Sequence, residues 1–395
     1  MIALILCDIF ESRCIYHYTG IPILSYDTGK INNALNVVNI ENIGNMEAEF
    51  MVLMWEEILE EPRTIERCLS RNRQLISEIA ADIRRSDIDK IVIAARGTSD
   101  HAAVYAKYVM ETTLGLPVAL AAPSVFTVYH GRLKLDKTLV IGISQSGKAA
   151  DVLEVIKSAK ESGALTVSIT NFSDSPLALE AKYHLDCSAG VERSVAATKT
   201  FLAQITLLAA LTAVWSGSAD MLDKLERMPR DIEKIIGNSD DIAEKVQRYR
   251  YMEECFVLAR GINYAIALES ALKIQETCYV RAKAYATSDF YHGPYAMIED
   301  GMPVFVFAPG GPSLKDMKEM IGRLKESGAE LIVISDVEEL RAQGDCSFSV
   351  PSMGDDVFSP FYNVVIAQMF ACRLALAKGL DPDSPRSLSK VTITK

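Results

Sequence analysis

The chain has 395 residues, of which 49% are hydrophobic and 24% are charged. This length and composition predict two to three globular domains and exclude a disordered or fibrous protein. The 52 acidic residues outnumber the 41 basic residues, for a formal net charge of −11. We therefore expect neither nucleic acid nor a membrane as a partner, because both attract basic surfaces.

The cysteines and histidines point away from a metal protein. Eight cysteines are spread along the chain without a C-x-x-C pair, and the five histidines show no metal-ligand spacing. A disulfide framework or a zinc site would need such clusters. We expect reduced thiols, a cytoplasmic location, no metal and no other cofactor.

The first part of the chain differs from the rest. Residues 1–45 show no helical or strand period and are interpreted as an N-terminal extension, either disordered or upstream of a native start at Met46. Residues 46–80 predict a leading pair of helices that is interrupted near Pro62.

Three later segments have distinct patterns. The apolar run at 207–215 is about half the length of a membrane span and predicts a buried helix. Residues 218–250 predict a charged helical linker. The tail, 381–395, contains two prolines and is expected to lie over the surface as an extended arm that reaches an active site.

Two parts of the chain repeat at a nearly constant spacing. Arg96-Gly97 recurs as Arg260-Gly261, 164 residues later, and the sequence KESGA recurs with an offset of 165. A spacing that is kept over several segments predicts two copies of one domain. We expect these copies at residues 81–217 and 251–380.

Each copy alternates short, almost wholly apolar runs with helical patterns. The runs are residues 91–95, 139–143 and 166–169 in the first copy, and 256–258, 304–307 and 331–334 in the second. Uninterrupted apolar strands are typical of parallel sheets that are covered by helices on both faces. The sequence therefore predicts an α/β fold made of two tandem, doubly wound α-β-α sandwiches.

Two polar turns follow predicted strands of the first copy. The turns ISQSG and RGTSD offer hydroxyls, an amide and free backbone N–H groups before a predicted helix, which is a favourable place for a phosphate group. Capping of the helix is the alternative function for these side chains. Neither turn is G-x-G-x-x-G, which disfavours a dinucleotide-dependent oxidoreductase. The residues in question are Gly97, Thr98, Ser99, Ser144, Gln145 and Ser146.

Ionisable side chains form a second set of candidates. Glu269, Lys273 and Glu276 fall on one face of a predicted helix, where a carboxylate can act as a general base; a solvated charged stripe is the alternative. His292 lies in an HGP turn, which is more often structural. Lys390 lies in the tail, where a desolvated lysine can form a Schiff base with a carbonyl group, although a terminal lysine is usually solvated.

These motifs occur in an order that resembles a known family. RGTS, ISQSG, VAATKTF, ALESALKIQE, HGP and PRSLSKVT are similar to the sugar isomerase (SIS) double-domain family, notably the isomerase part of glucosamine-6-phosphate synthase and the SIS-type glucosamine-6-phosphate deaminases. The resemblance covers roughly residues 47–395.

The resemblance implies a role for each candidate. The residues that would hold the phosphate of a sugar phosphate are Ser99, Ser144, Gln145 and Ser146. Glu276 would move a proton between C1 and C2, with Glu269 and Lys273 as polar companions. His292 would open the sugar ring from across the interface of a homodimer, and Lys390 would condense with the carbonyl.

The chain departs from the synthase pattern in three places. Lys148-Ala149 replaces Glu-Thr after ISQSG, and Ala197 replaces a serine at the substrate, so two hydroxyls are missing and Lys148 could supply charge instead. Ile2 stands where the synthase has its glutaminase cysteine. We therefore expect the chemistry to use free ammonia or water.

We expect a phosphosugar isomerase/deaminase that converts glucosamine 6-phosphate to fructose 6-phosphate and ammonia in a homodimer with a shared active site. A deglycase of fructosamine or other glycated-amine 6-phosphates and an ammonia-dependent aminating isomerase stay open. A non-catalytic sugar-phosphate sensor also stays open, although a sensor has no need for Glu276, His292 and Lys390 together.

Overall fold

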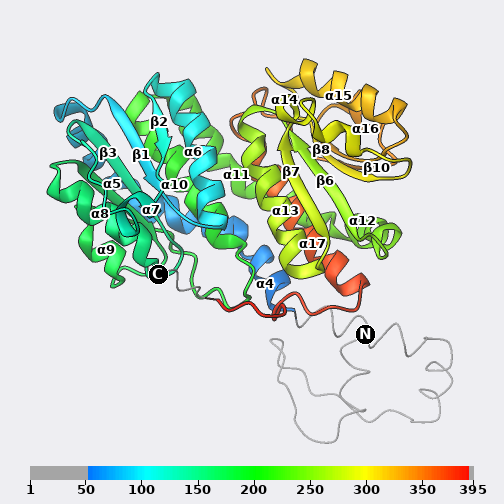
Figure 1. Cartoon of the computed structure of the whole chain (residues 1–395), viewed down its shortest axis with the longest axis horizontal. Coiled ribbons are helices and arrows are strands. Elements are labelled where there is room, and N and C mark those ends of the chain that lie inside the picture. The colour runs from blue at the N-terminus through cyan, green and yellow to red at the C-terminus, as the bar shows by residue number, and fades with distance from the viewer. Residues whose placement is uncertain (1–51, 391–395) are drawn as a thin grey trace, which may run out of the picture. The chain divides into compact units, whose positions relative to one another are not determined.

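Two α/β domains with parallel sheets make up the body of the chain (Figure 1). The structure is a computed structural model that describes residues 52–390, so the predicted extension at 1–45 lies outside the described residues. The strands of the first domain are β1 (Lys90–Ala94), β2 (Val118–Leu120), β3 (Thr138–Ile143), β4 (Leu165–Thr170) and β5 (Tyr183–Asp186). Those of the second are β6 (Glu254–Ala259), β7 (Arg281–Ala286), β8 (Pro303–Phe307), β9 (Glu330–Ser335) and β10 (Cys346–Ser349).

The two sheets have the same strand order. The first runs β2-β1-β3-β4-β5 and the second β7-β6-β8-β9-β10, with every pair parallel. In the first sheet Val92 lies opposite Val140, and the central strand β3 is buried along its whole length. The predicted α/β class and the double sandwich are therefore confirmed.

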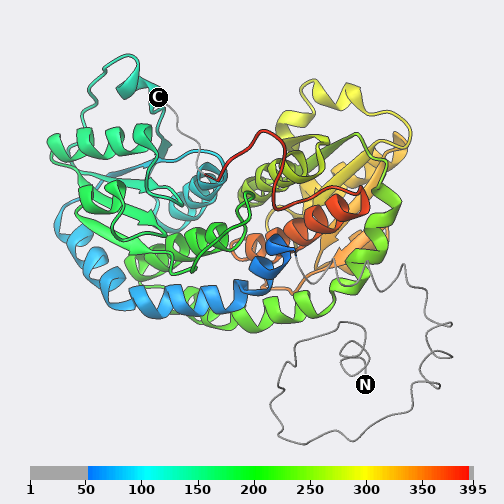
Figure 2. The same cartoon turned by 90° about the horizontal axis from the view of Figure 1, so that it is seen from below.

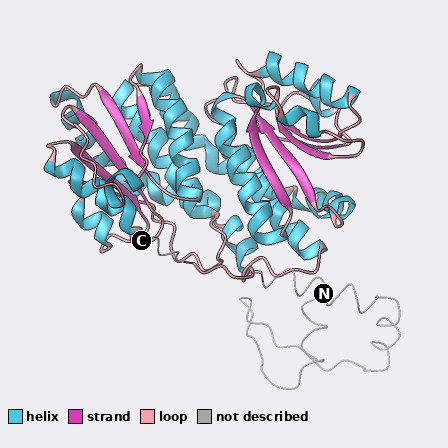
Figure 3. Cartoon of the chain, in the orientation of Figure 1, coloured by secondary structure: helices cyan, strands magenta, loops and turns pink. Residues whose placement is uncertain are grey.

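Helices cover both faces of each sheet (Figure 3). In the first domain they are α6 (Thr98–Leu114), α7 (Ser124–Thr127), α8 (Ala150–Glu161), α9 (Pro176–Glu180) and α10 (Lys199–Ser216). In the second they are η2 (Gly261–Asn263), α13 (Tyr264–Cys278), α14 (Thr287–Phe290), η3 (Pro294–Met297), α15 (Leu314–Glu326), α16 (Glu338–Arg341) and α17 (Ser359–Ala377). Their apolar faces meet the apolar strands and close the core.

Two helices, α10 and α17, are apolar on all sides. By length and composition alone both could span a membrane, yet 83% and 89% of their most apolar windows are buried inside the structure. A helix that is apolar all round is the expected centre of a large core. The run at 207–215 is thus part of a buried helix, as predicted.

Helices also occupy the segments on either side of the first domain. The leading pair is α4 (Leu53–Leu59) and α5 (Glu61–Arg85), and the connection between the domains holds α11 (Ala219–Gly237), α12 (Ser239–Lys245) and η1 (Val246–Tyr249). The leading helices separate at Glu60, two residues before Pro62, so the predicted interruption near Pro62 is confirmed; Pro62 itself lies in the first turn of α5. Proline is tolerated there because the first N–H groups of a helix have no partner within it.

The contact between α6 and α13 joins the two domains (Figure 1). Thr98, the first residue of α6, touches Lys273 near the end of α13, so the helices run in opposite directions. Each of them follows the first strand of its sheet, β1 or β6. The strands of the two sheets consequently point in opposite directions (Figure 3). The carboxyl edge of the first sheet therefore lies beside the end of α13.

Candidate functional site

The turn after β3 is folded tightly at the carboxyl edge of the first sheet. Gly147 has φ +63°, and a Cβ there would lie 2.0 Å from Ser175 Oγ, so no other residue fits. The hydroxyl of Ser144 accepts the Gly147 N–H at 3.2 Å, and that of Ser146 accepts the Lys148 N–H at 3.3 Å. The cap residue of α8 is Ala149, so these hydroxyls do not cap the helix.

A cavity of 270 Å³ opens beside this turn. Its lining brings the turn together with the C-terminal tail. The lining residues are Gln145, Ser146, Lys148, Phe172, Asp174, Ser175, Pro176, Glu192 and Lys390. Lys148 is exposed, and its ammonium forms no ion pair within residues 52–390. The predicted residues Gln145, Ser146 and Lys390 thus share one cavity, with a free positive charge at its edge.

The corresponding turn of the second domain is closed by carboxylates. Asp336 Oδ1 accepts the N–H of Gly310 at 2.6 Å, and Asp356 Oδ2 accepts that of Ser313 at 3.2 Å. A Cβ on Gly311 would lie 1.9 Å from Asp356 Oδ1. Side chains of the chain itself therefore occupy the place where an anion would sit, and the first domain holds the open turn.

Helix α13 presents three charged side chains to the start of α6. Lys273 Nζ lies 2.6 Å from Glu276 Oε2 and 3.4 Å from Glu269 Oε1, and it donates to Thr98 Oγ1 at 3.3 Å. Thr98 in turn donates to Glu269 at 3.2 Å, and His101 Nδ1 meets the other oxygen of Glu269 at 2.7 Å. The predicted single face is thus a connected network rather than a solvated stripe.

The three charged side chains of this network differ in how far they are buried. Burial alone would lower the pKa of Lys273, but the charges of Glu269 and Glu276 outweigh it and raise that pKa above its ordinary value. The side chains of Lys273 and Glu269 are 1% and 0% exposed, whereas that of Glu276 is 22% exposed. Glu276 is therefore the carboxylate of the network that a ligand can reach.

The tail lysine meets a buried carboxylate that the sequence did not single out. Lys390 Nζ donates to Glu192 Oε2 at 2.8 Å and to the carbonyl of Ser194 at 2.7 Å. Glu192 is buried, and it also accepts the N–H groups of Thr198 and Thr200 at 3.0 and 3.1 Å. Although burial opposes ionisation, the charge of Lys390 and these hydrogen bonds lower the pKa of Glu192.

The network around Lys273 and the ion pair of Lys390 with Glu192 lie at the same edge of the first sheet. Thr98 at the start of α6 bonds Lys273, and Glu192 accepts the N–H groups of Thr198 and Thr200 at the start of α10, a helix that packs on α6. Ser99 is buried next to Thr98, and its hydroxyl accepts a hydrogen bond from Gln204 Nε2 at 3.0 Å.

The remaining predicted residues of the first domain lie nearby. Gly97, with φ +53°, is the cap residue of α6, so the capping alternative for Thr98 and Ser99 is wrong. Ala197 is half-buried in the loop that carries Glu192.

His292 lies apart from the other predicted residues. It is exposed in the turn after α14, and the charge of nearby Asp289 acts on Tyr264, the first residue of α13. Glu276 lies near the other end of this 15-residue helix, roughly 20 Å away at 1.5 Å per residue. Among residues 52–390, the partners of the Glu276 carboxylate do not include His292.

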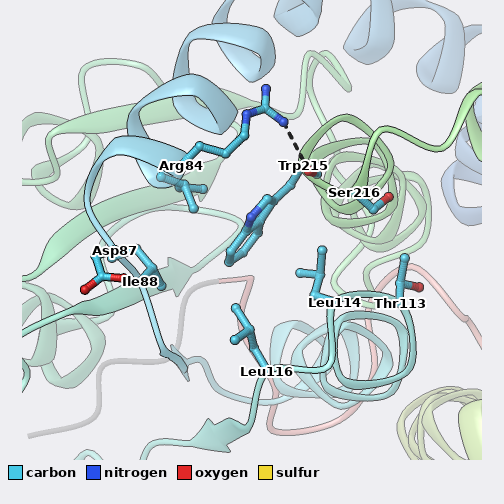
Figure 4. Close-up of a pocket in the computed structure, with 9 residues that line it drawn as sticks. Arg84, Asp87, Ile88, Thr113, Leu114, Leu116, Trp215 and Ser216 are labelled. Atoms are coloured by element: carbon cyan, nitrogen blue, oxygen red, sulfur yellow. Dashed lines mark hydrogen bonds between the residues drawn. The ribbon is translucent and has the colours of Figure 1, made fainter.

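A larger cavity of 410 Å³ lies at the opposite edge of the first sheet, where α5, α6 and α10 end (Figure 4). Arg84 lies over it and donates to the last carbonyls of α10, those of Val214 and Trp215, at 3.2 and 3.1 Å. None of the predicted site residues lines it.

Within residues 52–390 no three His, Cys, Asp or Glu side chains are grouped as metal ligands.

Replacing Lys273 tests whether the buried charges depend on one another. Lys273→Met keeps most of the length of the side chain but removes the ammonium that pairs with Glu269 and Glu276, so we expect a loss of about 3–5 kcal/mol in the free energy of unfolding. Urea denaturation measures it, with Lys157→Met, an exposed lysine of α8, as the control. The loss should shrink at acid pH, because protonated carboxyl groups need no counter-charge. An unchanged midpoint would contradict the network.

Comparison with known proteins agrees with this architecture. The chain is 34% identical over 339 residues to a glutamine–fructose-6-phosphate aminotransferase (isomerizing) of Methanothermobacter thermautotrophicus, which is 85% of this chain and 56% of that protein. It is 33% identical over 386 residues to the Aquifex aeolicus protein of the same name, with 96% and 62% covered. The chain thus spans less than two thirds of the length of these relatives.

Solved structures match the whole described body. A candidate phosphosugar isomerase of Silicibacter pomeroyi is 32% identical with a TM-score of 0.77, covering 84% of this chain and 100% of that one. The C-terminal domain of the glucosamine-fructose-6-phosphate aminotransferase of Francisella tularensis is 25% identical with a TM-score of 0.76, covering 85% and 98%. The SIS domain model matches residues 85–214 and 252–378, which is more than half of the chain. The chain belongs to the SIS domain family.

Proposed function

We propose that the chain is a phosphosugar isomerase that deaminates an amino-sugar phosphate, with glucosamine 6-phosphate as substrate and fructose 6-phosphate and ammonia as products. One observation supports the proposal: an open turn lined by hydroxyls, a partly exposed carboxylate and an amine bound to Glu192 lie at the same sheet edge. They are the turn at 144–148, Glu276 and Lys390.

The turn at 144–148 would bind the phosphate at the end of the sugar remote from the reaction. Its hydroxyls, backbone N–H groups and Lys148 suit an anion. Binding there fixes C1 and C2 of the open-chain sugar relative to the catalytic groups, which replaces a bimolecular encounter by a pre-oriented one. The interaction with a remote group offsets the cost of holding the open chain.

Glu276 would take the proton from C2 and return it to C1. This moves the double bond and converts the amino aldose into a ketose imine. Lys273 would keep Glu276 in place through their ion pair at 2.6 Å, and Glu269 would help to hold Lys273. The Lys390 amine would then replace ammonia at C2, and water would release the ketose from the lysine. Lys390 must leave Glu192 for this step.

Ring opening would require a second subunit in this scheme. His292 makes no hydrogen bond or ion pair with Glu276 within residues 52–390, so in this scheme the partner copy of a homodimer would bring it to the open edge of the first sheet. The names of the relatives, which are fructose-6-phosphate aminotransferases, support an amino-sugar phosphate as the substrate. The Thermotoga maritima glucosamine-6-phosphate deaminase, 23% identical with a TM-score of 0.68, shares the fold.

The direct test is turnover of glucosamine 6-phosphate by the purified protein. We expect ammonia and fructose 6-phosphate in equal amounts, measured by coupled assays. Turnover of a glycated-amine 6-phosphate alone would show a deglycase instead. Thermal stabilisation by fructose 6-phosphate without turnover of any amino-sugar or glycated-sugar phosphate would overturn the proposal and favour a sensor.

Glu276→Gln separates binding from proton transfer. Glutamine keeps the size and a hydrogen bond to Lys273 but cannot accept a proton, so we expect kcat to fall by about 10²–10⁴-fold with little change in the binding of fructose 6-phosphate. Steady-state kinetics and calorimetry measure the two effects. If kcat is retained, another group is the base.

Lys148→Ala tests the unusual residue of the phosphate turn. Because the lysine is exposed, its contribution to binding is screened by solvent, and we expect KM to rise by about 3–10-fold at an unchanged kcat. The rise should diminish with added salt. Lys157→Ala, on an exposed position of α8, is the control; equal KM values for both variants would remove Lys148 from the site.

A further inference from the structure

The loop at 191–200 carries both groups that hold the tail lysine. Glu192 and the carbonyl of Ser194 accept hydrogen bonds from Lys390 Nζ. Within residues 52–390 these two acceptors are the hydrogen-bond partners of the Lys390 ammonium. The residues that hold this loop in place therefore also set the position of the Lys390 amine.

The leading helices hold this loop from outside the first domain. Glu57 of α4 is 4% exposed, and its Oε1 accepts the backbone N–H groups of Arg193 and Ser194, the latter at 3.3 Å. Lys199, which is 1% exposed, donates to Glu60 Oε2 and to the carbonyl of Val191, each at 2.8 Å. Both ends of the loop are thereby tied to residues 57–60.

The same short helix holds the tail (Figure 2). The carboxylate of Asp383 accepts the backbone N–H groups of Leu53 and Met54, both at 2.7 Å, and its carbonyl accepts the N–H of Val195 at 3.3 Å. In Figure 2 the tail crosses from the end of α17 toward the first domain beside α4. Helix α4 therefore contacts the tail and the loop that receives its lysine.

We propose that Glu57 is a positioning residue for the Lys390 amine, acting with Asp383 through helix α4. The proposal rests on the proposed function, in which that amine attacks the sugar carbon. Glu57 does not touch the substrate in this scheme. It fixes the backbone at 193–194, and through it the distance between the amine and the phosphate turn.

The surroundings of the Glu57 side chain favour its protonated, uncharged form, which still accepts hydrogen bonds. Burial, with a smaller contribution from Glu192, raises the pKa of Glu57 to about 7, against the opposing effect of the Arg193 N–H and Lys390. Below that pH the side chain is mainly an uncharged acid whose oxygen still accepts the two N–H groups. Glutamine reproduces this state, whereas alanine removes the acceptor.

The test compares Glu57→Ala, Glu57→Gln and Glu56→Ala at pH 6.5. Glu56 is the matched control, since it pairs with Arg193 of the same loop through an exposed bridge, its side chain being 47% exposed. We expect Glu57→Ala to lower kcat by about 10–100-fold with little change in KM. Glu57→Gln should restore kcat, and Glu56→Ala should leave it unchanged.

A second readout does not depend on the substrate. Reductive methylation of Lys390 by formaldehyde and cyanoborohydride, followed by mass spectrometry, should be faster in Glu57→Ala than in the wild type or Glu56→Ala. If no sugar phosphate is turned over, the proposed function fails but this measurement still decides the role of Glu57. If Glu57→Ala does not fold, Asp383→Asn, at a partly exposed tail position, should show the same faster methylation. Unchanged methylation in the folded variant, or equal losses in Glu57→Ala and Glu57→Gln, would overturn the inference.

Discussion

Lys273, fully buried between two carboxylates, is the constraint on which the rest of the site depends. An unpaired charge at that depth would be strongly unfavourable, so the ammonium requires Glu269 and Glu276, and they require it. These three residues belong to the second domain, and their remaining partners, Thr98 and His101, belong to the first. The network therefore exists only where α6 and α13 pack. A single domain of this kind would expose half of a polar network and contain no complete site.

The two domains share a strand order but differ at their carboxyl edges. An ion pair at equivalent positions survives in both, Arg96 with Asp151 and Arg260 with Asp316, at 2.8 and 3.0 Å. The turns after β3 and β8 have diverged. Hydroxyls and a lysine surround the first, whereas aspartates fill the second and satisfy its N–H groups internally. An anion gains hydrogen bonds at the first turn, but at the second it would have to displace a carboxylate.

The sequence predicts the features that depend on residues close together in the chain. Apolar runs identified the three inner strands of each sheet because both faces of a parallel sheet are covered, whereas the less buried edge strands β2, β5, β7 and β10 lack such runs. Helical spacing placed Glu269, Lys273 and Glu276 on one face. Sequence reasoning did not reach Glu192, Glu57 or Asp383. Their partners are separated from them by 198, 136 and 330 residues, and no local pattern marks an acid that accepts backbone N–H groups from a distant loop.

The tail amine is held by a carboxylate that stays ionised. Because the pKa of Glu192 is lowered relative to the unfolded chain, its contribution to stability is present above the ordinary carboxyl range and is lost only as the pH falls through the lowered value. At neutral pH Lys390 is consequently anchored and partly neutralised by an ion pair. An amine in that state does not attack a carbonyl, so the pair must open during the proposed reaction.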